Sequence, residues 1–106
     1  MIGKFEELTL GALVRAGPDS HAAKVYTVLE GSLQKANSNV PPFAALYTAL
    51  DRMSKKGLVC ESKDEKDKRG KRLFTITGEG RRALDEAVNA TRAVMDFGGK
   101  TALGGF

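Results

Sequence analysis

Hydrophobic residues recur at helical spacing in three segments of the first half of the chain. The first segment, residues 4–16, carries five of them on one helix face: Phe5, Leu8, Ala12, Leu13 and Ala16. Gly17 and Pro18 follow directly, and they end a helix because glycine fits its terminus and proline cannot continue it. The pattern therefore predicts a first helix over residues 4–16.

A second and a third helix are predicted over residues 21–35 and 42–56. Asp19 or Ser20 is placed to cap the second helix, and Gly57 follows the third. The third segment has one apolar face, made of Phe43, Leu46, Tyr47, Leu50 and Met53. Its opposite face carries Ala44, Thr48, Asp51, Arg52 and Lys55. We therefore expect the third helix to be buried on one side and exposed on the other.

The second half of the chain predicts a β-hairpin and then a fourth helix. Residues 58–62 and 71–77 have the composition of strands and flank a charged, turn-rich segment, and residues 77–97 have a helical pattern. This last helix has an apolar stripe with spacings of four and three residues: Leu84, Val88, Thr91 and Met95. The stripe either pairs with a second copy of the chain or packs on its own core, and the sequence permits both.

The order of elements is helix, helix, helix, strand, strand, helix, which predicts an α+β fold that is mostly α. We expect one domain over residues 1–97, because the 106-residue chain suffices for one compact domain and no linker divides it. Residues 98–106 contain four glycines and are predicted to form a flexible tail.

Positive charge is concentrated in one part of the sequence. Lys and Arg number 17 against 13 Asp and Glu, which gives a net charge of +4. Residues 1–36 and 73–106 each carry four bases and four acids, so the whole excess lies between residues 37 and 72. A neutral body with one basic segment is typical of a protein that binds a polyanion. The alternative is a solvated loop whose charges only keep the protein in solution.

The basic segment follows the third helix directly, and together they predict a DNA-binding surface. An exposed helix face fits the major groove, and small side chains let it approach the base edges. The candidates on the helix are Ala44, Tyr47, Thr48, Arg52 and Lys55. Those on the hairpin are Lys68, Arg69, Lys71 and Arg72, which suit phosphates or a minor groove. Tyr47 has two compatible interpretations, as a core aromatic ring and as a hydroxyl group that meets a phosphate.

Other classes of protein find little support. Cys60 is the only cysteine, so the chain forms no internal disulfide or cysteine metal cluster, and we expect this side chain to be buried and inert. His21 has no motif partner and no carboxylate pair stands out, so we predict no catalysis, no metal and no cofactor. No apolar run approaches the roughly 20 residues that cross a membrane. Residues 1–10 lack a signal-peptide core, and we expect a cytoplasmic protein.

Two blocks of sequence resemble the PadR-like family of transcriptional regulators. The first is ALYTALDRM at residues 45–53, followed by KGLV at residues 56–59. The second is KRLFTIT at residues 71–77, followed by GRRAL at residues 80–84. The resemblance implies a winged helix-turn-helix with a two-stranded wing, in which the third helix reads DNA and residues 78–97 form a C-terminal dimerisation helix.

The resemblance also implies a dimeric repressor that binds operator DNA. Tyr47 corresponds to the family's tyrosine on the recognition helix, and Lys71 and Arg72 correspond to its wing bases. Some members respond to small aromatic or drug-like ligands in the dimer interface, which implies a small aromatic effector as a further partner. The chain departs from the family where Pro42 and Ala44 stand in place of the hydroxyl residue and glycine that usually open the third helix.

The sequence thus predicts a sequence-specific DNA-binding repressor that acts as a homodimer on a pseudo-palindromic operator. A second hypothesis is a winged-helix module that binds protein instead of DNA, since a fold does not fix a function. That alternative requires an exposed apolar patch beside Arg52, and the sequence shows none. An enzyme is the third hypothesis, and no constellation of residues supports it.

Overall fold

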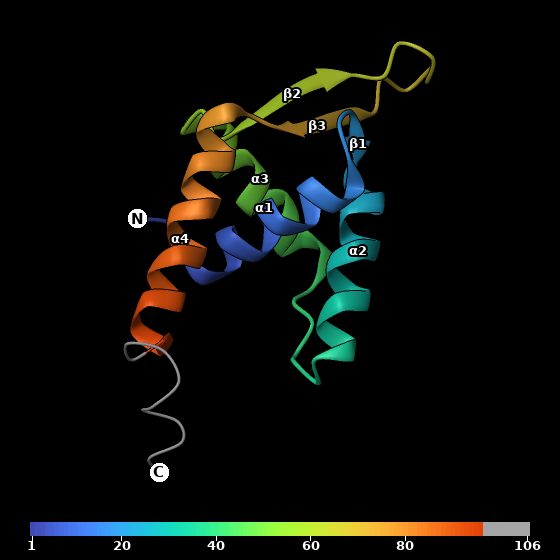
Figure 1. The fold of residues 1–106 in the computed structure, drawn as a ribbon. Coiled ribbons are helices and arrows are strands. Elements are labelled where there is room, and N and C mark those ends of the chain that lie inside the picture. The colour runs from blue at the N-terminus through green and yellow to red at the C-terminus, as the bar shows by residue number, and fades with distance from the viewer. Residues whose placement is uncertain (97–106) are drawn as a thin grey trace.

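The computed structural model describes residues 1–96 as four helices and a small antiparallel sheet (Figure 1). The helices are α1 (Lys4–Ala16), α2 (Ala22–Lys35), α3 (Phe43–Lys55) and α4 (Gly78–Asp96). The strands are β1 (Ser20–His21), β2 (Val59–Lys63) and β3 (Arg72–Ile76). The predicted fold class is confirmed, and each predicted helix and strand is found with its ends shifted by no more than one residue. The predicted flexible tail lies outside the described residues.

The sheet has one more strand than the hairpin that the sequence predicts. Its order is β1–β3–β2, so β3 lies in the middle and is antiparallel to both neighbours. The short β1 pairs Ser20 with Phe74 and His21 with Leu73. Figure 1 shows the helices on one side of this sheet only. One face of the hairpin therefore has no helix packed on it.

The residues before α2 join α1 to the sheet and do not cap the helix. The expectation that Asp19 or Ser20 caps α2 is wrong, because His21 is the N-cap residue and no side chain bonds there. The Ser20 hydroxyl group donates a hydrogen bond to the Gly17 carbonyl oxygen at 2.8 Å. The Asp19 amide donates to Thr75 Oγ1 at 2.9 Å, which fastens this turn to β3.

A single hydrophobic core lies between the first three helices and the sheet. Its largest fully buried apolar side chains are Phe74, Leu10, Leu13, Leu46, Leu50, Met53 and Val25. Phe43 is an exception to the predicted stripes, because it lies in the first turn of α3 and stays 39% exposed. The ring of Phe43 packs edge-on between Tyr26 and Tyr47, with centroids at 5.1 and 5.2 Å.

Cys60 is exposed, so the expectation that it is buried is wrong. Side chains alternate between the two faces of a strand. Val59 points into the core, and its neighbour Cys60 therefore lies on the face that no helix covers.

The turn from α3 into β2 fixes where the hairpin leaves the helix. Gly57 adopts a φ of 78°, a left-handed conformation that favours glycine. The Leu58 amide donates to the Met53 carbonyl at 2.9 Å, and the Gly57 amide donates to the Ser54 carbonyl at 3.1 Å. This pair of bonds is the Schellman ending of a helix, so the chain passes from α3 to β2 without a linker.

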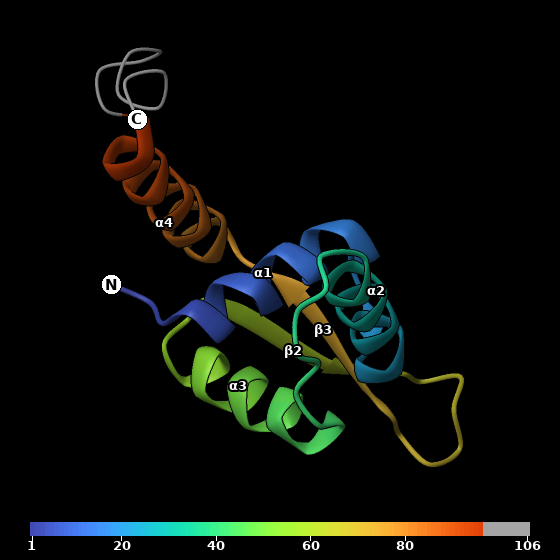
Figure 2. The same cartoon turned by 90° about the horizontal axis from the view of Figure 1, so that it is seen from below.

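Within residues 1–96, only the first half of α4 packs on the hydrophobic core. Gly80 is the one buried residue of α4, and Ala83 and Leu84 pack against the core while remaining partly exposed. Every residue from Val88 to the end of the helix is exposed. Figure 2 shows α4 pointing away from α3 and from the tip of the hairpin. None of the helices over residues 1–96 is long and apolar enough to span a membrane.

Candidate nucleic-acid interface

The outer face of α3 presents the predicted helical candidates to solvent. Ala44, Thr48, Arg52 and Lys55 are all exposed, while Leu46 and Leu50 hold the opposite face in the core. The Thr48 hydroxyl group donates a hydrogen bond to the Ala44 carbonyl oxygen at 3.4 Å. Among the described residues no ion pair involves Arg52 or Lys55. Both positive charges therefore remain available to a ligand.

Tyr47 lies at the border between this face and the core. It is partly buried, and its ring packs edge-on against Phe43 and Phe74, with centroids at 5.2 and 6.5 Å. The guanidinium carbon of Arg72 lies 5.5 Å from the centroid of the Tyr47 ring. This position is compatible with both interpretations of Tyr47, a packing ring and a hydroxyl group at the edge of the surface.

The start of α3 has no capping side chain. Pro42 is the N-cap residue, and no side chain hydrogen-bonds to the first turn. The Tyr26 hydroxyl group donates to the Pro41 carbonyl oxygen at 2.7 Å, which ties the turn before α3 to α2. The Ala45 amide donates to the Pro42 carbonyl oxygen at 3.0 Å, so the backbone itself satisfies one of the first amides of α3.

Acidic side chains accept hydrogen bonds from backbone amides in the turns of the hairpin tip. The Asp64 carboxylate accepts a hydrogen bond from the Lys66 amide at 3.0 Å, and Asp67 accepts one from the Arg69 amide at 2.8 Å. Asp64 also lies 3.0 Å from His21 Nε2. The Lys66 amide, and next the His21 ring, lower the pKa of the Asp64 carboxyl group. Four exposed lysines surround these turns without an ion pair among the described residues: Lys63, Lys66, Lys68 and Lys71.

Arg72 is held differently from the other predicted wing bases. Its Nε donates to Glu61 Oε2 at 2.7 Å, and its Nη2 donates to Glu61 Oε1 at 2.8 Å and to Asp51 Oδ1. Its guanidinium carbon lies 5.1 Å from the centroid of the Phe74 ring. Hydrogen bonds from Arg72 lower the pKa of the Glu61 carboxyl group. Sequence reasoning placed Arg72 among the DNA-contacting side chains and did not assign Glu61 and Asp51 to it as partners.

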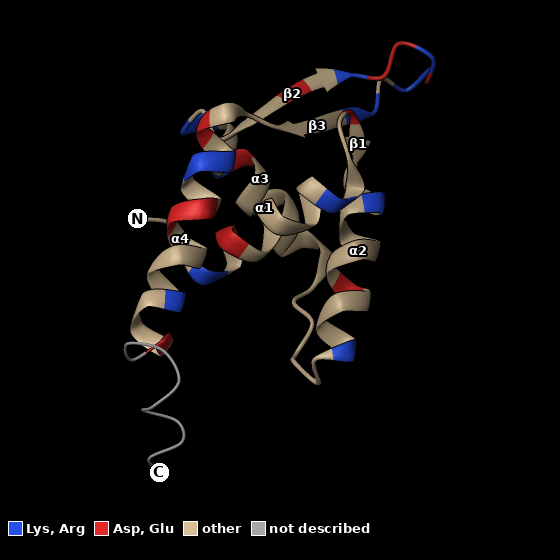
Figure 3. Ribbon diagram, in the orientation of Figure 1, with Lys and Arg blue, Asp and Glu red and all other residues tan. Residues whose placement is uncertain are grey.

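The structure brings α3 and the hairpin together on one side of the molecule (Figure 2). A groove of about 350 Å³ runs between them, and its lining includes His21, Phe43, Tyr47, Lys71 and Arg72. The tip loop, which contains Lys68 and Arg69, extends beyond the sheet and is densely charged (Figure 3). Of the predicted residues, this groove brings together Tyr47, Lys71 and Arg72, whereas Thr48 and Arg52 line a separate hollow against residues 3–6 at the start of α1.

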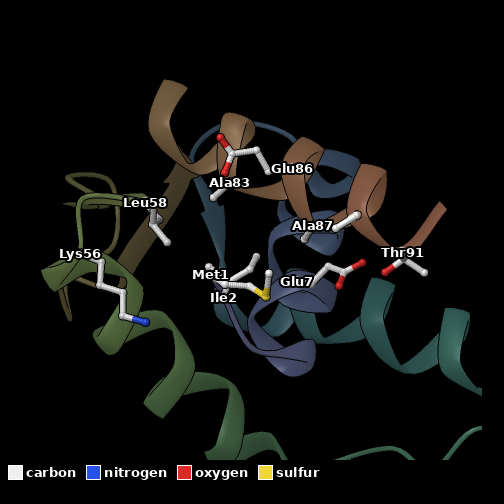
Figure 4. Close-up of a pocket in the computed structure, with 10 residues that line it drawn as sticks. Met1, Ile2, Glu7, Lys56, Leu58, Ala83, Glu86, Ala87 and Thr91 are labelled. Atoms are coloured by element: carbon white, nitrogen blue, oxygen red, sulfur yellow. The ribbon is translucent and has the colours of Figure 1, made fainter. Parts of the chain in front are cut away.

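A second hollow lies on another side, between the N-terminus and α4 (Figure 4). It has a volume of about 660 Å³, and Met1, Ile2, Leu58, Ala83 and Ala87 provide an apolar lining. Its remaining lining residues are Glu7, Lys56, Glu86, Ala90 and Thr91. Within residues 1–96 no group of three or more His, Cys, Asp or Glu side chains is arranged to hold a metal ion.

Comparison with solved structures defines the class of fold as the winged helix of DNA-binding regulators. BpsR of Bordetella bronchiseptica, whose DNA binding is regulated by 6-hydroxynicotinic acid, matches with a TM-score of 0.69 and 21% identity. That match covers 89% of this chain and 59% of BpsR, so the chain spans less than two thirds of that protein. RosR of H. salinarum matches with a TM-score of 0.62 and 23% identity over 87% of this chain and 76% of RosR.

The family is defined by sequence as well as by fold. The profile of the transcriptional regulator PadR-like family matches residues 19–86. A PadR family transcription regulator from hypervirulent Clostridium difficile R20291 matches with a TM-score of 0.66 and 20% identity, over 88% of this chain and 92% of that one. A search of curated proteins gave no match. The chain belongs to the PadR-like family of transcriptional regulators.

Proposed function

We propose that this protein is a repressor that binds a pseudo-palindromic DNA operator as a homodimer. The observation that carries the proposal is the outer face of α3, where Arg52 and Lys55 are exposed near Thr48 and form no ion pair with another described residue. The basic hairpin lies on the same side of the molecule. A helix face of this kind fits the major groove, and exposed lysines neutralise phosphates and release counterions.

In the proposed complex each candidate has a role that follows from its position. Ala44 lets the α3 backbone approach the bases, Thr48 contacts a base edge or a thymine methyl group, and Arg52 reaches a guanine. Tyr47 and Lys55 meet phosphates at the edge of the helix. On the hairpin the phosphate or minor-groove contacts come from Lys68, Arg69 and Lys71.

The homodimer forms through α4 in this proposal. Val88, Thr91 and Met95 continue the stripe that begins at Leu84, and all three are exposed. Pairing two copies of α4 covers this apolar surface and places two α3 helices in successive major grooves, about 34–36 Å apart.

The proposal extends to a small aromatic effector in the hollow between the N-terminus and α4 (Figure 4). The volume of about 660 Å³ is in the range of small-molecule sites, and the lining is mostly apolar with a few charged groups. Thr91 belongs both to this lining and to the dimer stripe. An effector bound there touches the helix on which the spacing of the two α3 helices depends.

Selection of bound duplexes from a random DNA pool tests the proposal and supplies the operator for fluorescence anisotropy. We expect Arg52→Ala to weaken operator binding and to relax specificity at one base pair, by about 1–3 kcal/mol. We expect Lys68→Ala with Lys71→Ala to weaken binding to all duplexes and to reduce the slope of log K against log salt by about 1.8. Arg82→Ala on α4 removes one exposed positive charge away from the proposed surface and serves as the control.

The proposal is overturned if the selection enriches no sequence from the random DNA pool. If the Arg52 and lysine variants bind the operator as tightly as the Arg82 control does, DNA does not bind at the proposed surface. The protein-binding alternative gains support only if the chain fails to select DNA at all.

A further inference from the structure

Three secondary-structure elements meet at one guanidinium group beside the proposed DNA surface. Arg72 on β3 donates to both carboxylate oxygens of Glu61 on β2, at 2.7 and 2.8 Å. The same side chain donates to Asp51 on α3. Glu61 lies 11 residues from Arg72 along the chain and Asp51 lies 21 residues away. The cluster therefore links the recognition helix to both strands of the hairpin.

The faces of the Arg72 guanidinium group are also occupied. Its carbon lies 5.5 Å from the centroid of the Tyr47 ring and 5.1 Å from that of Phe74, within the range of cation–π attraction. The Arg72 side chain is only 34% exposed. Tyr47 belongs to α3 and Phe74 to β3, so the aromatic contacts join the same two elements as the ion pairs.

The charge of the cluster argues against a direct phosphate contact. One guanidinium group faces the two carboxylates of Asp51 and Glu61, so the three side chains carry a net charge of −1 and do not attract a phosphate. Lys71, which directly precedes β3, is exposed and has no ion pair among the described residues. Two adjacent basic residues at the start of this strand thus have different surroundings.

We propose that Arg72 is a positioning residue that fixes the angle between α3 and the hairpin, and that Lys71 is the phosphate contact. This inference rests on the proposed function, because it assumes that α3 and the hairpin bind DNA together. Arg72 holds the Asp51 carboxylate against the start of β3 and away from the phosphates that Arg52 and Lys55 approach. A lysine cannot replace it, because one ammonium group lacks the planar fork that bridges two carboxylates.

The test measures anisotropy on the selected operator and on an unrelated duplex over a series of salt concentrations. We expect Arg72→Gln to reduce operator affinity by about tenfold, the equivalent of one lost base contact, and to change binding to the unrelated duplex little. The slope of log K against log salt stays at the wild-type value. We expect the matched control Lys71→Gln to weaken both duplexes and to lower the slope by about 0.9.

Two further variants separate positioning from charge. Arg72→Lys keeps the positive charge and is expected to bind like Arg72→Gln. Asp51→Asn removes the α3 end of the link and raises the net charge, and it is expected to lower the ratio of operator to unrelated binding. If Arg72 instead contacts DNA, Asp51→Asn frees it and strengthens binding to both duplexes. Thermal unfolding of each variant verifies that the chain is folded.

The outcomes are distinct. A reduced salt slope for Arg72→Gln, or wild-type binding by Arg72→Lys, overturns the positioning role while leaving the DNA-binding function intact. A wild-type chain that does not distinguish the two duplexes overturns the proposed function, and the role of Arg72 in DNA recognition with it.

Discussion

Glu6 connects the start of α1 to the end of α3. Glu6 is only 7% exposed. Its carboxylate accepts hydrogen bonds from Lys56 Nζ at 3.1 and 3.3 Å and from the Gly3 amide at 3.1 Å. Burial raises the pKa of this carboxyl group. The hydrogen bonds from the Gly3 amide and the Lys56 ammonium group together lower the pKa by more than burial raises it, so the pKa lies below its ordinary value of 4.5. Folding therefore favours the ionised form of Glu6.

We expect Glu6→Gln to destabilise the protein at neutral pH by about 1–2 kcal/mol, since hydrogen bonds to a charged group are lost. A carboxyl group whose pKa is lowered by folding stabilises the native state above its unfolded pKa and loses that contribution as the pH falls. The difference between wild type and variant should thus shrink below about pH 4.5. Urea unfolding at several pH values measures it, with Glu65→Gln on the exposed hairpin tip as the control. A difference that is constant with pH contradicts the assigned role.

Single residues show where the sequence is sufficient and where it is not. The outer face of α3 follows from helical spacing alone, because the spacing itself defines which residues share a face. The environment of Arg72 does not follow from spacing. Its partners lie 11 and 21 residues away along the chain and contact it only when the hairpin packs against α3. Counting charges located the basic region but could not tell which Lys or Arg side chain forms an ion pair within the protein.

At the scale of elements, local signals explain why the predicted boundaries are close to the observed ones. Gly57 ends α3, and Thr77 Oγ1 accepts a hydrogen bond from the Gly80 amide at 3.0 Å to cap α4. Such caps involve residues within a few positions of each other, so the sequence contains them. Strand β1 has only two residues and exists because β3 pairs with it, which no local periodicity can reveal.

The junction between α4 and the hairpin depends on the absence of a side chain at Gly80. A Cβ atom there would lie 2.9 Å from Ile76 Cγ1 and would overlap the Leu58 carbonyl oxygen. We expect Gly80→Ala to destabilise the protein by about 1–3 kcal/mol, the usual cost of overpacking. Gly31 in α2 is the matched control because it has open space around it, and Gly31→Ala should stabilise by about 0.5–1 kcal/mol. Thermal unfolding that shows the same sign for both variants contradicts this account.

At the scale of the whole molecule, α4 has two distinct halves. The sequence left open whether its apolar stripe packs on its own core or on a second copy. The structure divides the stripe, because Leu84 packs against the core whereas Val88 and Met95 are 36% and 56% exposed. The outer half therefore presents apolar surface that the other described residues do not cover.

We expect Val88→Glu with Met95→Glu to convert a homodimer to a monomer, because each substitution places a charge in the apolar contact. Leu84 is left unchanged since its loss would also disturb the core. Ala93→Glu, on the opposite side of α4 by helical spacing, is the control and should remain dimeric. Light scattering measures the mass of all three proteins. A wild-type mass of one chain excludes the α4 dimer.

The hydroxyl group of Thr77 links the end of α3 to the start of α4. It donates to the Gly57 carbonyl at 2.6 Å where α3 ends, and it accepts from the Gly80 amide where α4 begins. One side chain thus links the start of α4 to the end of α3, the helix that we propose enters DNA. The 19 residues of α4 make a lever of about 28 Å, so a tilt of about 10° moves its far end by about 5 Å. In the proposed homodimer, small changes of angle between paired α4 helices would in this way be amplified into changes of distance between the two α3 helices.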